Sequence, residues 1–151
     1  MTYKPIPWGG EWERCFGQPD MYDTWFISGP SAGGKSSFVM QLAKKLCEYG
    51  VVLYCSYEEK VSMSFKERIE RFHMEEEQGR FRVCTDTDID NLKRMLKQRK
   101  GPRFIIVDSF QHSHWEFAQV EALVNEFHRK SFIFISQESK SQSLSKPAVR
   151  L

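Results

Sequence analysis

The sequence has no apolar stretch long enough to cross a membrane. Its longest apolar runs, Phe104 to Val107 and Phe132 to Ile135, have the length of strands, whereas a spanning helix needs roughly 20 residues. The N-terminus, MTYKPIPWGGEWER, also lacks the charged-then-apolar pattern of an export signal. We therefore expect a cytoplasmic protein that makes no membrane contact.

A CxxC pair and an internal repeat are absent as well. The four cysteines are scattered, at Cys15, Cys47, Cys55 and Cys84, which fits reduced thiols better than a disulfide framework. Hydrophobic residues make up 40% and charged residues 28% of the chain, so most of it is expected to fold. The net charge of +2 neither requires nor excludes a nucleic-acid partner.

A chain of 151 residues has room for one domain with a sizeable core. We expect residues 1–151 to form a single domain. Within it, residues 1–22 are a lead-in segment, and the polar, Ser-rich residues 138–151 hold a mobile loop and a candidate start of a further strand.

Strand-like and helix-like patterns alternate along the chain, which is typical of a parallel α/β sheet. We predict a three-layer α/β sandwich with a mainly parallel sheet of about five strands and helices on both faces. The expected strands are residues 24–28, 51–55, 81–84, 104–107 and 132–135. The expected helices are residues 35–49, residues 60–73, a segment capped by Thr87 or Asp88, and a segment that includes Val120 to Phe127.

Between the first strand and the first helix, the segment GPSAGGKS matches the complete GxxxxGK[ST] phosphate-binding loop, or Walker A motif. Glycines let backbone N–H groups approach a phosphate, and the following helix adds the positive end of its dipole. Lys35 can reach the terminal phosphates and Ser36 can bind Mg²⁺. The alternative is a glycine-rich turn. The predicted nucleotide-binding residues are Gly29, Pro30, Ser31, Ala32, Gly33, Gly34, Lys35, Ser36 and Ser37.

Asp108 follows the apolar run Phe104 to Val107. A carboxylate at the end of a buried strand beside a P-loop can hold Mg²⁺ through its water shell, as Walker B aspartates do. The alternative is an aspartate that starts a turn or caps a helix. We predict a metal site formed by Ser36 and Asp108, with ATP and Mg²⁺ as the cofactors.

With these motifs in order, the sequence resembles the RecA-like ATPases, especially the branch of the RadA proteins, the replicative hexameric helicases and the KaiC-like proteins. The resemblance runs from about Phe26 to Leu151 and rests on VLYCSYEE, FIIVDSFQ and FIFISQESK after the P-loop. RecA-like cores continue with more strands after the last of these segments. The chain is therefore expected to be a fragment or a short member.

The resemblance implies a role for three further residues. Glu58 matches the glutamate that polarises the attacking water, and Glu59 is the alternative because neighbouring strand-end side chains point in different directions. Both could instead begin a solvated helix. Gln137 matches the polar sensor of the γ-phosphate, or is an exposed amide at the end of a strand. The resemblance also implies that the Gln137 strand lies between the P-loop strand and the Asp108 strand.

In RecA-like recombinases, two loops contact single-stranded DNA, and they correspond here to residues 109–116 and 138–146. The first offers rings for stacking on bases, at Phe110, His112, His114 and Trp115, and the second offers Lys140 and Lys146 for phosphates. Both can equally be ordinary loops whose aromatic residues lie in the core or in a subunit contact. A His112–His114 metal pair is not favoured, because no third ligand stands nearby. The basic stretch 93–100 fits the solvated face of a helix better than a nucleic-acid patch.

We expect an ATPase that assembles as a ring or filament, with its active site shared between identical subunits, and that acts on DNA in recombination, repair or replication. One alternative is a KaiC-like regulatory or assembly module with slow hydrolysis and no DNA. Another is a small-molecule kinase, which the absence of an Arg-rich lid segment disfavours.

Overall fold

The computed structural model describes residues 24–29, 35–77, 79–137 and 148–150. The predicted lead-in and the predicted loop from residue 138 to residue 147 lie outside these ranges. Within the described ranges, six strands form one sheet in the order β3-β2-β4-β5-β1-β6, and every neighbouring pair is parallel. They are β1 (Thr24–Gly29), β2 (Val52–Ser56), β3 (Phe81–Cys84), β4 (Phe104–Asp108), β5 (Ser131–Gln137) and β6 (Ala148–Arg150).

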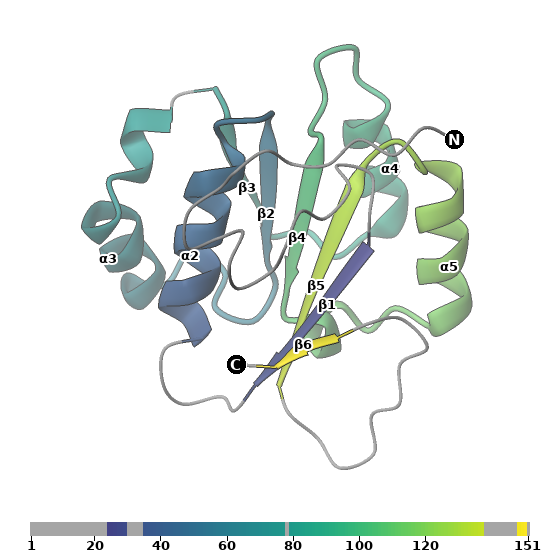
Figure 1. Cartoon of the computed structure of the whole chain (residues 1–151). Coiled ribbons are helices and arrows are strands. Elements are labelled where there is room, and N and C mark those ends of the chain that lie inside the picture. Colours follow the sequence, from purple (N-terminus) through teal and green to yellow (C-terminus); the bar gives the residue numbers. More distant parts are fainter. Residues whose placement is uncertain (1–23, 30–34, 78, 138–147, 151) are drawn as a thin grey trace.

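Two helical layers cover the sheet and complete the three-layer α/β sandwich (Figure 1). Helices α2 (Lys35–Leu46) and α3 (Met63–Arg71) pack on one face, followed by the 3₁₀ turn η1 (Met74–Glu77). Helices α4 (Ile89–Leu96) and α5 (Phe117–Glu126) pack on the other face, and the 3₁₀ turn η2 (Phe110–Ser113) precedes α5. The predicted fold class is confirmed, with the short strand β6 added to the expected five.

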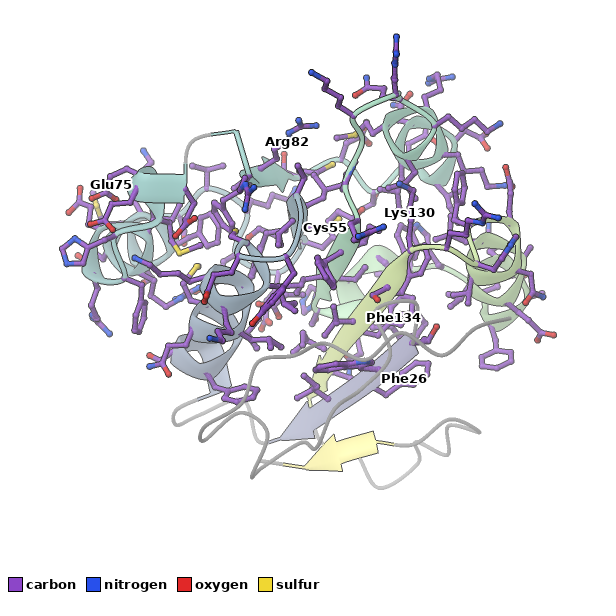
Figure 2. The ribbon with its side chains drawn as sticks, turned by 45° about the horizontal axis from the view of Figure 1, so that its top comes forward. Phe26, Cys55, Glu75, Arg82, Lys130 and Phe134 are labelled. Carbon is purple, nitrogen blue, oxygen red and sulfur yellow. The ribbon has the colours of Figure 1, made fainter. Side chains whose placement is uncertain are left out.

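The central strands are apolar at consecutive positions because both of their faces are buried. In β4, Phe104 and Ile106 pack beneath α2 and α3, while Ile105 and Val107 pack beneath α4 and α5. The same alternation places Phe26 of β1 beside Phe134 of β5, with ring centroids 5.3 Å apart (Figure 2). The sheet thus has two separate cores, one on each face.

The starts of two helices add to the prediction: one lies later than predicted, and the other decides between two predicted capping residues. Helix α3 begins at Met63 rather than at residue 60, because the Ser62 side chain caps it by accepting a hydrogen bond from Phe65 N at 3.2 Å. Asp88, and not Thr87, caps α4 by accepting from Asp90 N at 2.9 Å. The segment before α3 is therefore free to form a turn at the end of β2. Within the described residues, no helix is long and apolar enough to cross a membrane.

Candidate nucleotide site

The P-loop segment joins β1 to α2. Strand β1 ends at Gly29 and helix α2 begins at Lys35, so the strand before and the helix after the loop are both present. Residues 30–34 lie outside the described residues, and for Gly29, Lys35, Ser36 and Gln137 the structure describes the backbone. The α2 helix is 12 residues long, and its amino end, which includes Ser37, supplies the partial positive charge that an anion needs.

Three strand ends that carry predicted site residues lie side by side. Gly29 of β1 pairs in register with Gln137 of β5, and Asp108 of β4 pairs with Ile135 of β5. The Gln137 strand therefore lies between the P-loop strand and the Asp108 strand, as expected. On the other side of β4, Ser56 of β2 pairs with Asp108, which brings the turn that contains Glu58 to the same edge of the sheet.

The carboxylate of Asp108 is buried and held by a tyrosine. Tyr54, in the middle of β2, donates its O–H to Asp108 Oδ2 at 2.6 Å, and Asp108 is only 8% exposed. Burial raises the pKa of Tyr54 well above its ordinary value, and the negative charge of Asp108 raises it further. The phenol therefore keeps its proton, and its charge-assisted hydrogen bond fixes the orientation of the carboxylate.

Tyr54 was not among the predicted site residues. Tyr54 lies inside the apolar run Val51 to Cys55, which predicts that it is buried. A buried tyrosine O–H normally has a hydrogen-bond partner, so the sequence indicated that such a partner exists. The identity of that partner depends on the pairing of β2 with β4. Local sequence patterns therefore could not identify Asp108 as the partner.

Asp108 also anchors the turn that carries Glu58. Its backbone carbonyl accepts hydrogen bonds from Tyr57 N at 2.7 Å and from Glu58 N at 3.2 Å. The peptide bond that follows, between Asp108 and Ser109, is cis. The Glu58 side chain is exposed, so this turn presents a carboxylate to solvent from a backbone fixed to the end of β4.

The neighbouring Glu59 has a structural partner. Its Oε1 accepts from Arg68 Nη1 at 3.1 Å, and its Oε2 pairs with Arg68 Nη2. Arg68 lies on α3, is buried, and places its guanidinium 5.8 Å from the centre of the Phe65 ring. The Ser56 hydroxyl donates to Lys60 O at 2.8 Å and closes the turn. Glu59 thus fastens the turn to α3, and the exposed Glu58 is the candidate to face a substrate.

The groups at this edge fit a magnesium nucleotide better than a metal held by protein alone. Among the described residues, no group of three or more His, Cys, Asp and Glu side chains could hold a metal ion. Mg²⁺ is commonly bound by one or two protein oxygens together with phosphates and water. The buried carboxylate of Asp108, at the same edge of the sheet as the end of β1, matches that pattern.

In the loop 109–116, the rings of Phe110 and Trp115 pack against the protein interior. Trp115 is buried, its Nε1 donates to Thr87 O at 2.8 Å, and its ring meets Tyr57 edge-on at 5.6 Å. Phe110 is half-buried and meets Phe134 edge-on at 5.7 Å. Of the two readings left open above, core packing holds for these rings, because they cover the α4–α5 face of the sheet. The second predicted DNA loop, residues 138–146, lies outside the described residues.

Comparison with known proteins places the fold. No protein-family model and no curated protein matches the sequence. Solved structures do match it. A KaiC-like protein from Pyrococcus horikoshii has a TM-score of 0.71 at 15% identity, covering 95% of this chain and 74% of that one. The flagellar accessory protein FlaH from Methanocaldococcus jannaschii has a TM-score of 0.67 at 16% identity, covering 93% and 74%.

A third match is the ATP synthase subunit NeqB from Nanoarchaeum equitans, with a TM-score of 0.65 at 6% identity. It covers 94% of this chain, which spans 46% of that subunit. At these identities the likeness concerns the fold. The chain has the fold of the RecA-like P-loop ATPases, as its motif order implied. The solved structures with a similar fold include that of a KaiC-like protein.

Proposed function

We propose that the chain binds ATP with Mg²⁺ and hydrolyses it. The observation that carries the proposal is the meeting of the ends of β1, β4 and β5 at one edge, with the Glu58 turn hydrogen-bonded to the last residue of β4. Bound Mg²⁺-ATP would supply the phosphoanhydride bond and the charge neutralisation of phosphoryl transfer.

Each residue has a stated role in this proposal. Lys35 and Ser36 hold phosphate and metal, supported by the amino end of α2, and the loop from Gly29 to Ser37 encloses the phosphates. Asp108, oriented by Tyr54, would hold Mg²⁺ through its water shell. Glu58 orients and deprotonates the attacking water, and Gln137 senses the γ-phosphate. The fixed backbone at Glu58 supports this assignment because catalysis needs a positioned base.

The proposal includes a homo-oligomer with sites shared between subunits, in the cytoplasm. Val61 and Met63 follow the Glu58 turn and are 54% and 72% exposed. Large apolar side chains exposed beside a site suit a contact with a second copy of the chain. We further propose that this assembly acts on DNA.

A second candidate is a KaiC-like regulatory or assembly module that hydrolyses ATP slowly and binds no DNA. The match to a KaiC-like structure at a TM-score of 0.71 favours it. Two of the four rings that DNA bases were expected to meet, Phe110 and Trp115, pack within the protein, whereas His112 and His114 are exposed. The packing of Phe110 and Trp115 also favours the second candidate.

One experiment separates these candidates. The rate of phosphate release from ATP is measured against protein concentration, with and without DNA. A rate per subunit that rises with concentration and with DNA supports the first candidate. A slow rate that depends on concentration but not on DNA supports the second. Transfer of phosphate to a nucleoside instead of water contradicts both.

A further inference from the structure

The amino edge of the sheet, where the parallel strands begin, carries a concentration of positive charge. Six residues at this end of the sheet form what we call the basic edge: Arg80, Arg82, Arg99, Lys100, Arg103 and Lys130. Arg80, Arg103 and Lys130 immediately precede β3, β4 and β5, and the first residues of these strands are aligned by their pairing with Val52 and Phe104. Figure 2 shows Arg82 and Lys130 along this edge, which is turned toward the viewer.

Specific contacts hold several of these cations together. Arg82 Nη2 donates to Lys100 O at 3.4 Å, and Lys130 Nζ donates to Pro102 O. The Arg103 side chain lies over Gly50, where an added Cβ would come within 3.1 Å of it. Burial lowers the pKa of Lys130, and the positive charge of Arg103 lowers it further. The positive charges of Arg103 and Lys130 therefore lie close enough to repel each other, and an anion that approached them would relieve this repulsion.

The tendency of basic residues to gather at helix ends does not account for this arrangement. The macrodipole favours cations in the last turn of a helix, which explains Lys93 and Arg94 in α4. Arg82 belongs to strand β3 and Arg103 directly precedes β4, and strands have only small net dipoles. The nearby acidic residues include Glu126, which Lys93 and Lys97 approach at 3.7 and 3.6 Å, and Glu77, which lies beside Arg80 and Cys47.

We propose that the basic edge binds the phosphate backbone of duplex DNA, independently of base sequence. Strands lie about 4.8 Å apart, so the row from β3 to β5 is roughly 14 Å long, which equals the axial rise of about four base pairs of duplex DNA. Four of the six residues are arginines, whose planar guanidinium suits phosphate oxygens. This proposal rests on the DNA partner of the proposed function. It assigns the DNA contact to the basic edge instead of the loop 109–116.

The chemistry of this edge favours nucleic acid over a lipid surface and a backbone contact over base stacking. Of the Phe, Tyr and Trp side chains described, Phe117 is the exposed one, and it begins α5 at the opposite edge. The other exposed large apolar residues are Val61, Met63 and Val83, and Val61 and Met63 follow the carboxyl end of β2. Peripheral membrane segments insert apolar side chains beside their cations, and single-strand binders stack aromatic rings on bases.

The position leaves the nucleotide site accessible. Strand β4 runs from Phe104, next to Arg103, to Asp108. At about 3.3 Å per residue, the two edges lie roughly 13 Å apart. DNA on the basic edge and ATP at the carboxyl edge can therefore be bound together.

The test uses the full chain without nucleotide and a fluorescein-labelled DNA duplex of random sequence, with anisotropy measured over a salt series. The variant Arg99→Gln/Lys100→Gln is compared with Lys66→Gln/Arg71→Gln. Each pair removes one lysine and one arginine from exposed positions, so the net charge of the two variants is the same. Circular dichroism melts confirm that both fold.

We expect the edge variant to bind the duplex about tenfold more weakly and to lower the slope of log affinity against log salt by about 1.8. The control variant should keep the wild-type slope. Arg82→Gln, as a second edge variant, should lower the slope by about 0.9. Equal losses in the edge and control variants would overturn the proposal. So would loss of binding to phosphatidylserine vesicles without loss of binding to DNA.

The result also separates this proposal from the proposed function. If the wild-type chain binds DNA and both variants bind it equally, the basic edge is wrong and the DNA partner stands. If the wild-type chain binds ATP but no duplex at low salt, the DNA partner and the basic edge both fail, and the ATPase proposal stands.

Discussion

The two edges of the same sheet are built on different principles. At the carboxyl edge, Tyr54 holds the Asp108 carboxylate at 2.6 Å, Asp108 O holds the Glu58 backbone, and Arg68 holds Glu59. At the amino edge, the cations donate to backbone carbonyls instead: Arg80 Nη1 to Cys47 O at 2.8 Å, Arg82 Nη2 to Lys100 O at 3.4 Å, and Lys130 Nζ to Pro102 O. Under the proposed function, the placed atoms of the carboxyl edge would serve chemistry, and under the further proposal the charges of the amino edge would serve recognition of a polyanion. If both proposals hold, one α/β sheet divides these two tasks between its ends.

Lys35→Ala should have the largest effect and would show that the carboxyl edge binds nucleotide. Removal of the positive charge at the start of α2 leaves the phosphates without their main counter-charge. We expect ATP affinity to fall at least about 1,000-fold, or about 4 kcal/mol, by titration calorimetry. Lys66→Ala, exposed on α3, is the control. Equal affinity of Lys35→Ala and wild type would remove the nucleotide site from this edge.

Glu58→Gln tests whether the exposed carboxylate at this edge performs the chemistry. The amide keeps the shape of the side chain but cannot accept a proton. We expect the hydrolysis rate to fall about 100-fold with ATP affinity unchanged, measured by phosphate release and calorimetry. Normal turnover in Glu58→Gln would transfer the role to Glu59.

Glu59→Gln should instead act mainly on stability. Arg68 is buried, and the variant leaves its guanidinium without the charge that it pairs with at two points. We expect about 2 kcal/mol lower free energy of unfolding in urea. Glu67→Gln, exposed on the same helix, should change little. A Glu59→Gln protein as stable as wild type would mean that the ion pair does not hold the turn.

Tyr54→Phe removes the O–H that orients Asp108 and keeps the ring, which packs at 5.4 Å from Phe65. We expect a loss of about 1.5 kcal/mol of stability near neutral pH. The pKa of Tyr54 is raised by folding from an ordinary value of 10.0, so the stability that this group contributes is present below pH 10 and declines as the pH rises above it. Urea unfolding above and below about pH 10 should therefore show the two proteins converging. Parallel pH profiles would contradict this account.

Lys97→Ala, near the amino edge, should have the smallest effect. Its side chain is 64% exposed and lies 3.6 Å from Glu126, and exposed ion pairs of this kind contribute little. We expect less than about 0.5 kcal/mol change in the free energy of unfolding. A larger loss would show that this part of the molecule also depends on specific geometry, and the contrast between the edges would weaken.

Local patterns were sufficient for much of the fold. The apolar runs at residues 104–107 and 132–135 identified two central strands because strands buried on both faces must be apolar throughout. Helix starts were less accurate. The helix that was predicted to start at residue 60 begins at Met63, because Ser62 occupies the N-cap position.

Side-chain partners in the candidate site were harder to predict. The motif order indicated Asp108 and the pair Glu58–Glu59, but Tyr54 and Arg68 were missed. Their roles depend on the pairing of β2 with β4 and on the packing of α3, over separations in sequence that local patterns do not span. For Phe110 and Trp115 the sequence left two readings open, because an aromatic residue in a loop can face either solvent or the core.

By itself, the sequence determined the class of fold and the edge at which a nucleotide is expected, because periodic apolar runs and the P-loop motif act through local backbone conformation. Only the tertiary structure distinguished Glu59, paired with Arg68, from the exposed Glu58, and only it joined Tyr54 to Asp108. It also aligned Arg80, Arg103 and Lys130, which lie far apart in the chain, into one row. The physical reason is the register of the parallel strands, which brings distant residues together at a common edge.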